Sequence, residues 1–139
     1  MVGKGNGDVT LGGPLGPCSP MFIVASIQSS LGHYVGRLGF NCRYAAPEES
    51  PFFAIVGRDS AQVLLKVVDA QTKALPNRER HRWAPWDAFL YVADPDSLYA
   101  EFVDRRVCME RMLGVTDEGL FGFEIADPDG YVCFFGRPT

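Results

Sequence analysis

Residues 86–102 have the sequence WDAFLYVADPDSLYAEF, in which a strand signal stands directly before a helix signal. Trp86–Val92 is rich in aromatic and apolar side chains, which predicts a strand. Asp94-Pro95 supplies a typical N-cap residue followed by proline at the first helical position. Leu98 and Phe102 are spaced to lie on one buried face of the helix. This stretch therefore predicts a strand followed by an amphipathic helix.

Three more strands are predicted after this helix, and the same order of elements occurs once before it. The strands after it are predicted at 107–112, 120–126 and 131–135. Asp127-Pro-Asp-Gly130 joins the last two, with proline where a type I turn favours it and glycine free to adopt a positive φ. The elements before it are a strand at 20–25, a helix at 27–38 and strands at 40–45, 52–56 and 61–68. Either Ser26 or Ser29 can cap the start of the helix at 27–38, and Gly39 suits the position just past its end.

The duplicated order predicts one domain built from two modules and preceded by an arm. The arm, residues 1–17, holds six glycines and two prolines, so ordering it would cost much entropy and bury little. The domain is predicted to span 18–136, with module one at 19–68, a linker at 69–85 and module two at 86–136. A chain of 139 residues is long enough to bury one core of this kind.

Composition and charge argue against several classes of protein. Hydrophobic residues make up 47% of the chain and the net charge is −4, which argues against intrinsic disorder and against a nucleic-acid partner. No apolar run approaches the roughly 20 residues of a membrane-spanning helix, so no membrane partner is expected. The four cysteines lack C-x-x-C spacing, which favours reduced thiols and a cytoplasmic protein. Cys42, Cys108 and Cys133 lie in predicted strands, where burial would raise the pKa of each thiol and leave it unreactive.

The duplicated order and three short motifs resemble the vicinal oxygen chelate superfamily, which includes glyoxalases, extradiol dioxygenases and bleomycin-resistance proteins. The motifs are Pro20 with Leu38-Gly39-Phe40, the stretch Tyr91–Glu101, and the closing stretch Phe123–Val132. The last two are closest in pattern to the bleomycin-resistance branch. The resemblance implies an α+β fold, in which two βαβββ modules form a cup-shaped, curved mixed sheet with helices on the convex face.

Metal-using members of this superfamily place one ligand on the first and the last strand of each module. Carried over to this chain, the four positions are Ser19, one of Leu64, Leu65 or Lys66, Asp87 and Phe134. These positions offer one carboxylate and one hydroxyl, whereas a metal centre needs three or four convergent donors. We therefore expect no bound metal and no other cofactor. His33 and His81 are expected on the surface rather than at a metal.

Without a metal, the concave face would bind an organic ligand, and strand alternation predicts which side chains line it. The predicted ligand-binding residues are Met21, Lys66, Trp86, Asp87, Phe89, Tyr91 and Phe134. Their aromatic rings suit a flat ligand, and Asp87 would attract an amine. In one alternative the rings simply fill the cup as a core, and in another Trp86 and Trp83 anchor the linker. The basic run Asn77–Arg82 is either a solvated loop or a means of attracting an anionic group.

Taken with the resemblance, these residues predict a small-molecule binding protein with no catalytic residue, for which antibiotic sequestration is one possible role. The expected partner is an aromatic or amine-bearing small molecule, and the resemblance implies a homodimer. The alternative is a divalent-metal-dependent lyase, isomerase or dioxygenase that recruits Asp87, Glu124 or Glu101. A third hypothesis is an interaction protein whose cup is packed shut.

Overall fold

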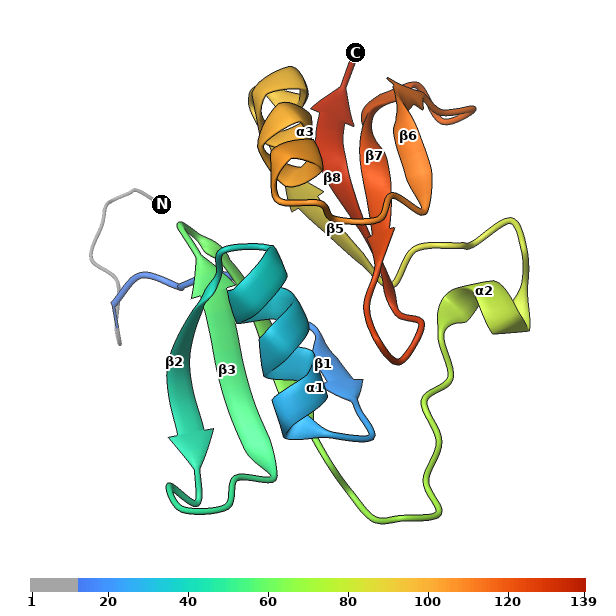
Figure 1. Cartoon of the computed structure of the whole chain (residues 1–139). Coiled ribbons are helices and arrows are strands. Elements are labelled where there is room, and N and C mark those ends of the chain that lie inside the picture. The colour runs from blue at the N-terminus through green and yellow to red at the C-terminus, as the bar shows by residue number, and fades with distance from the viewer. Residues whose placement is uncertain (1–12) are drawn as a thin grey trace.

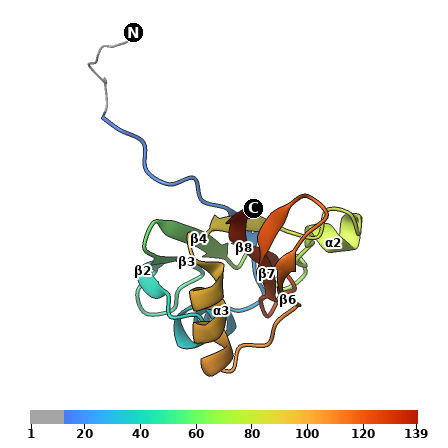
Figure 2. The same cartoon turned by 90° about the horizontal axis from the view of Figure 1, so that it is seen from above.

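The computed structural model describes residues 13–139, which fold into two four-stranded sheets, each with a helical segment packed on it (Figure 1). Residues 1–12 of the predicted arm lie outside the described residues. Residues 13–17 lead away from the sheets, as the view from above shows (Figure 2). Among the described residues, no helix combines the length and the apolar character that crossing a membrane requires.

The first module forms one mixed sheet with the strand order β1-β4-β3-β2. Its elements are β1 (Met21–Ile23), α1 (Ile27–Leu31), η1 (Gly32–Arg37), β2 (Asn41–Ala46), β3 (Phe53–Arg58) and β4 (Ala61–Lys66). Strand β1 runs parallel to β4, whereas the other neighbours are antiparallel. The helical segment of α1 and η1 is the crossover that connects β1 to the rest of the sheet.

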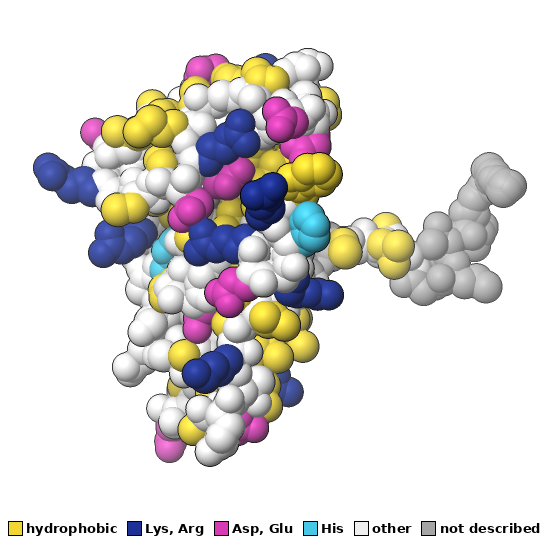
Figure 3. Space-filling model, turned by 90° about the vertical axis from the view of Figure 1, so that its right-hand side faces the viewer, with side chains coloured by type: hydrophobic (Ala, Val, Ile, Leu, Met, Phe, Trp, Pro, Cys, Tyr) yellow, Lys and Arg dark blue, Asp and Glu magenta, His cyan; other side chains and the backbone are white. Residues whose placement is uncertain are grey.

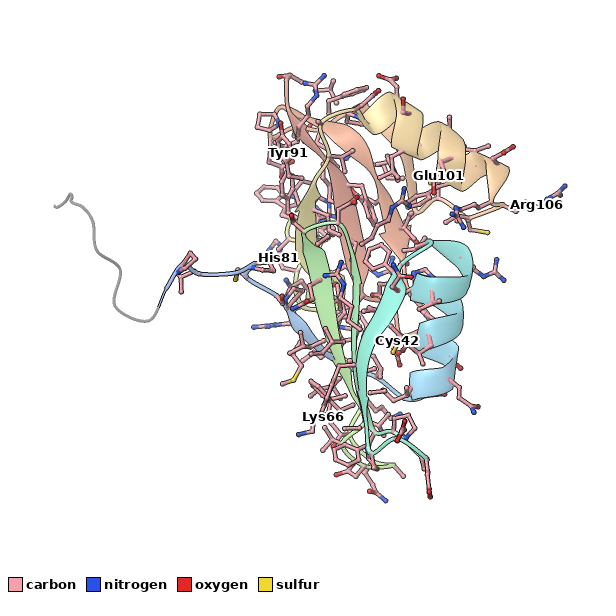
Figure 4. All side chains as sticks on the ribbon, turned by 90° about the vertical axis from the view of Figure 1, so that its left-hand side faces the viewer. Cys42, Lys66, His81, Tyr91, Glu101 and Arg106 are labelled. Carbon is pink, nitrogen blue, oxygen red and sulfur yellow. The ribbon has the colours of Figure 1, made fainter. Side chains whose placement is uncertain are left out.

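The second module repeats this topology with the order β5-β8-β7-β6. Its elements are β5 (Ala88–Tyr91), α3 (Pro95–Asp104), β6 (Arg111–Val115), β7 (Leu120–Ala126) and β8 (Val132–Pro138). Strand β5 is parallel to β8, as β1 is to β4. The predicted α+β fold of two βαβββ modules is therefore confirmed. In the side view of Figure 4, α1 with η1 and α3 lie on one side of the strands. We call the opposite side of both sheets, which neither α1 nor α3 covers, the helix-free face.

Local capping signals predict the element ends well. Ser26 is the N-cap of α1, and its Oγ accepts a hydrogen bond from the backbone N–H of Ser29 at 3.1 Å. Asp94 caps α3 in the same way, accepting from the N–H of Ser97 at 3.2 Å. Gly39 and Gly130 adopt φ values of 74° and 90°, the left-handed region that glycine occupies without strain.

Four elements differ from the prediction. The helix at 27–38 continues from α1 as the wider turns of η1, which end in a bond from the Leu38 N–H to the His33 carbonyl. The linker contains one helical turn, α2 (Asn77–Arg80), where the sequence favours a loop. Strand β6 begins at Arg111 rather than 107, because Val107 closes the end of α3 by bonding to the Phe102 carbonyl. Strand β8 continues to Pro138, beyond its predicted end at 135.

Burial differs from expectation at three residues. His33 is buried rather than on the surface, because the turns of η1 direct it toward the ring of Tyr34. Cys42 and Cys108 are exposed, so their predicted burial is wrong. Cys42 lies on the edge strand β2, and Cys108 precedes β6 instead of lying within it. Cys133 is buried as expected, and burial raises the pKa of its thiol to about 12.

The two modules are joined where the turn of one sheet meets the first strand and helix of the other. At the closed joint (Phe22, Tyr34, Asp127 and Tyr131), the β7–β8 turn packs on β1 and η1. The Tyr34 hydroxyl donates to Asp127 Oδ2 at 2.9 Å, and the rings of Phe22 and Tyr131 stack with centroids 4.3 Å apart.

At the open joint (Arg58, Ala61, Leu90 and Phe102), the β3–β4 turn faces β5 and α3. Arg58 forms a bidentate ion pair with Glu101, with N···O distances of 2.8 and 2.9 Å.

Candidate ligand-binding site

Three aromatic side chains stack on the helix-free face of the second sheet. The ring of Trp86 lies over Phe134 with centroids 4.3 Å apart and planes 27° apart. Phe89 lies on the other flank of Phe134, at 5.8 Å and 13°. Phe134 is fully buried beneath its neighbours, although this face of its strand has no helix on it. The stack therefore forms an aromatic floor for the face.

Two glycines allow Phe134 to lie flat on the sheet. Gly122 of β7 pairs with Gly136 of β8, directly beside Phe134. A Cβ at Gly122 would meet Phe134 Cε2 at 2.8 Å, and a Cβ at Gly136 would meet the same atom at 2.6 Å. Because neither position carries a side chain, the ring can occupy the space above the backbone of both strands.

Glu124 places a buried carboxylate beside the aromatic floor. It is 6% exposed and pairs in register with Phe134 on one side and Arg111 on the other. The indole N–H of Trp86 donates to Glu124 Oε2 at 2.8 Å, and Arg111 Nη1 lies 4.0 Å from the same oxygen. The hydrogen bond fixes the plane of the indole over Phe134, because it anchors the outer edge of the ring.

A pocket of about 400 Å³ opens beside Trp86. It is lined by Arg82, Trp83, Pro85, Trp86, Arg111, Asp117 and Glu118, which come from the linker and from β6 and its loop to β7. Trp83 stands at the rim with 78% of its surface exposed, whereas Trp86 is half-buried in the stack. The two tryptophans thus differ in role, since Trp86 packs and Trp83 remains open to solvent.

Asp87 connects the linker to the second sheet. Its two carboxylate oxygens accept backbone N–H groups of Asn77 and Val132, each at 2.8 Å. The Asn77 side chain in turn donates to the Trp86 carbonyl at 2.9 Å. The carboxylate that was expected to face a ligand is therefore engaged by the main chain, and it holds α2 against the start of β8.

The seven predicted ligand-binding residues are distributed over both sheets. Trp86, Phe89 and Phe134 form the stack, and Asp87 lies next to Trp86 in the chain. Tyr91 extends from the far end of β5 with 68% of its surface exposed. Met21 and Lys66 belong to the first sheet, on β1 and β4. Figure 4 shows Tyr91 and Lys66 on the helix-free side of the strands and Glu101 on the helix side.

The basic run 77–82 forms part of the pocket wall but not a uniform basic surface. Arg78 pairs with Glu110 at 2.9 Å, and Glu79 lies between two arginines. Seen from the side that carries α2, basic and acidic side chains are interleaved (Figure 3). An acidic pair, Asp117 and Glu118, completes the pocket opposite Arg82.

At three of the four positions where metal-using members of the resembled superfamily carry ligands, the residues do not fit a divalent ion. Asp87 already accepts two backbone N–H groups, and Phe134 has no donor atom. The Ser19 hydroxyl accepts a hydrogen bond from Gln62 at 3.2 Å. Within residues 13–139, no three His, Cys, Asp or Glu side chains lie close enough together to hold one ion. His33 is held neutral in the first module, where burial and then the charge of Arg37 lower its pKa to about 4.

Arg111 and the loop residues Asp117 and Glu118 are parts of the pocket that the sequence did not assign to the site. Their role depends on how β6 pairs with β7, which brings Arg111 opposite Glu124. The sequence alone offers Glu124 only as a possible metal ligand. One signal of its present role was available, because a glutamate between Phe123 and Ile125 interrupts an otherwise apolar strand.

Comparisons with known proteins agree with this architecture. No protein-family sequence model and no curated protein matches the chain. The bleomycin-binding protein of Streptomyces verticillus, solved with copper(II)-bleomycin, is 20% identical with a TM-score of 0.65, over 91% of this chain and 98% of that one. A bleomycin-binding protein solved with bleomycin is 14% identical with a TM-score of 0.67, over 90% of this chain and 100% of that one. A superfamily member from Sphaerobacter thermophilus is 23% identical with a TM-score of 0.59, over 85% and 93% of the two chains. The chain therefore has the fold of the glyoxalase/bleomycin resistance/dioxygenase superfamily, the superfamily that its motifs resemble.

Proposed function

We propose that this protein binds an aromatic, amine-bearing small molecule on the helix-free face of its second sheet, without a catalytic metal. The observation that carries the proposal is the indole of Trp86, which is held over Phe134 by its hydrogen bond to the buried Glu124. A ring fixed in this way needs little further ordering when a flat ligand stacks on it. The pocket beside it is large enough for part of a drug-sized molecule.

The charges around the pocket favour an amine that is accompanied by hydrogen-bond acceptors. Glu124, Asp117 and Glu118 provide negative charge, whereas Arg82 and Arg111 provide positive charge. A ligand with one amine and several carbonyl or hydroxyl groups would satisfy both signs. A purely anionic ligand would meet three carboxylates at close range.

Bleomycin is the first ligand to test, because two proteins with this fold were solved in complex with it. If this chain binds such a compound tightly and reversibly, its biological role would be antibiotic sequestration. Isothermal titration calorimetry with metal-free and copper-loaded bleomycin measures this directly. A panel of aromatic amines in a thermal-shift assay extends the search, because a ligand of the folded state raises the melting temperature by mass action.

Two variants locate the binding. Trp86→Ala removes the upper ring of the stack and is expected to weaken binding by about tenfold or more, as loss of a buried aromatic contact does. Val103→Ala is the matched control, because Val103 is an exposed apolar residue on α3, on the helix side of the sheet. Equal loss of affinity in both variants, or none in Trp86→Ala, would contradict the proposed site.

Metal analysis separates this proposal from the enzymatic alternative. The purified protein is expected to retain no stoichiometric Ni, Zn, Mn or Fe, and its ligand affinity is expected to be unchanged by a chelator. A retained ion at one equivalent per chain would favour a metal-dependent lyase, isomerase or dioxygenase.

We also propose that the protein forms a homodimer through its helix-free faces. Outside the aromatic stack, Met21, Tyr44 and Tyr91 are each more than half exposed, and all three lie on strands. Apolar side chains at this density are typical of a surface that a partner covers. A second copy of the chain is the partner that the resemblance to the superfamily implies.

A further inference from the structure

A second pocket lies at the open joint, and Phe89 of the aromatic stack is one of its lining residues. Its volume is about 560 Å³, and its floor is apolar, formed in part by Leu90, Phe102 and Ala61. Arg58 and Asp59 lie on its polar side. The pocket is bounded by β5, α3 and the β3–β4 turn, so it belongs to the boundary between the modules.

Strand register shows which residues correspond in the two joints. Phe22 of β1 pairs with Leu65 of β4, and Leu90 of β5 pairs with Phe135 of β8. Phe22 therefore corresponds to Leu90, and Leu65 to Phe135. Counting back from Leu65 and Phe135 by the same number of residues reaches Ala61 in one module and Tyr131 in the other.

At the closed joint, Tyr131 fills the space over the first strand. Its ring lies parallel to that of Phe22, with an interplanar angle of 5°. Its hydroxyl donates to the Ile23 carbonyl at 2.8 Å. At the open joint Ala61 occupies the corresponding position and has no ring, so the space over Leu90 is left as a pocket.

The acceptor that a phenol would use is also present at the open joint. Tyr91 corresponds to Ile23, because each directly follows the paired residue of its strand. The N–H of Val92 points to β8, where it donates to the Gly136 carbonyl. Successive residues of a parallel strand point to opposite sides, so the Tyr91 carbonyl faces the other side of β5. Among residues 13–139, β5 is the edge strand of its sheet, so no described strand lies on that side.

We propose that this pocket binds a neutral hydroxylated aromatic compound, whose phenol group takes the place that Tyr131 occupies at the other joint. The ring would lie over Leu90, and the hydroxyl would donate to the Tyr91 carbonyl. A carbonyl accepts but does not donate, so the ligand must keep its phenolic proton. The nearby carboxylate of Asp59 likewise disfavours a phenolate, while the Arg58 guanidinium is already paired with Glu101. This site is additional to the proposed site at Trp86 and does not depend on it.

A matched pair of probes tests the hydroxyl. Calorimetry would compare 2-naphthol with 2-methoxynaphthalene, which keeps the rings but cannot donate. We expect 2-naphthol to bind about fivefold more tightly, the effect of one neutral hydrogen bond. Equal affinities, or no binding of 2-naphthol up to its solubility limit, would overturn the proposal.

A matched pair of variants tests the location. Ala61→Tyr supplies the missing ring from the chain itself, and it is expected to reduce 2-naphthol affinity by at least about tenfold while the melting temperature is kept or raised. Ala70→Tyr makes the same change at an exposed linker residue and is expected to leave the affinity unchanged. If Ala61→Tyr does not fold, Ala61→Leu fills part of the same space and is expected to weaken binding as well.

The proposals for the two sites can be tested independently of each other. Trp86→Ala is expected to leave 2-naphthol binding unchanged, and Ala61→Tyr is expected to leave binding at the aromatic stack unchanged. Loss of 2-naphthol binding in Trp86→Ala together with its retention in the Ala61 variants would assign the probe to the stack and overturn the pocket proposal.

Discussion

Asp127 and His33 are buried ionisable residues with shifted pKa values. Their two shifts change the free energy of unfolding in opposite directions as pH rises. Burial raises the pKa of Asp127 to about 6, although hydrogen bonds from Tyr34 and two backbone N–H groups partly offset this. Burial lowers the pKa of His33 to about 4. In both cases the folded state favours the neutral form of the side chain.

The sign of each contribution follows from proton linkage. Between pH 4 and 6 the folded chain holds a proton on Asp127 that the unfolded chain releases, so this residue makes stability fall as pH rises. Between pH 4 and 6.5 the unfolded chain holds a proton on His33 that the folded chain does not, so stability rises with pH. The two contributions therefore oppose each other between pH 4 and 6.

The variant Asp127→Asn should remove the contribution of Asp127 to the pH dependence of stability and leave that of His33. The variant removes the cost of burying a charge at neutral pH and keeps an acceptor for the turn. Its stability relative to the natural chain should therefore increase as pH rises from 4 to 7, by up to about 3 kcal/mol for a shift of two pH units. Urea unfolding at several pH values measures this difference. A difference that stays constant with pH would contradict the assignment.

His33→Gln should show the opposite trend. Because the natural chain must deprotonate His33 to fold in acid, the variant should gain stability relative to it as pH falls from 6.5 to 4. The same urea series tests this. A relative gain toward high pH would show that His33 is charged in the folded state.

Asp87 is expected to matter for stability whether or not a ligand contacts it. Asp87→Ala leaves the N–H groups of Asn77 and Val132 without acceptors, and it should cost about 2–4 kcal/mol. Asp87→Asn keeps one acceptor oxygen and should cost about half as much. Asp104→Ala, at the exposed end of α3, is the control and should cost under about 0.5 kcal/mol. A neutral effect of Asp87→Ala in thermal unfolding would contradict the structural role.

At the scale of elements, the close pairing of β7 with β8 requires a glycine at position 122, because any side chain there would meet the neighbouring strand. A Cβ at Gly122 would lie 2.1 Å from the Phe135 carbonyl oxygen, so the two strands would have to separate. Gly122→Ala should cost about 3 kcal/mol or more and should also displace Phe134 from beneath Trp86. Near-ultraviolet circular dichroism and thermal unfolding report the two effects.

Gly114→Ala is the control for this substitution, because its Cβ would meet an atom only at 3.9 Å, an ordinary contact, on the neighbouring strand β6. It should change stability by less than about 1 kcal/mol. Similar losses in both variants would indicate a general intolerance of alanine in the sheet rather than a specific close approach.

Elements whose signals are local were predictable from the sequence. The N-caps at Ser26 and Asp94 and the turn at Gly130 depend on neighbouring residues alone, and they are confirmed. Strand β6 was placed too early, because Val107 satisfies an apolar pattern while it packs at the end of α3 rather than in the sheet. The turn α2 was missed because its anchor is Asp87, ten residues further along the chain.

The site was less predictable than the fold, because its contacts join different strands. Strand alternation predicts that Phe89 and Phe134 share the concave face, and Trp86 is expected at the entry to the second module. Neither expectation indicates that the carboxylate of Asp87 is engaged by the main chain. The pairing of Arg111 with Glu124 depends on a bulge in the β6–β7 register, for which periodicity gives no signal. Ala61 and Tyr131 are recognised as corresponding residues only when the strand registers of the two modules are compared, and the sequence alone does not give those registers.

At the scale of the whole molecule, the two modules share a topology but differ in how they are joined. The closed joint is filled by Tyr131 and pinned by a buried hydrogen bond between Tyr34 and Asp127. The open joint is pinned by a half-exposed ion pair, which contributes less in water. The asymmetry leaves one boundary tightly packed and the other able to admit a ligand.

The helix-free faces of both sheets give the last prediction, which concerns assembly. If a second copy covers these faces, light scattering after size-exclusion chromatography should give twice the chain mass of 15.3 kDa at micromolar concentration. Tyr91→Glu places a charge in this face and should shift the equilibrium to monomer, because a buried unpaired charge is costly. Val103→Glu adds the same charge to another exposed apolar position, on the helix side, and should leave the mass unchanged. A monomeric mass for the natural chain at every concentration, or dissociation by Val103→Glu alone, would place the interface elsewhere or remove it.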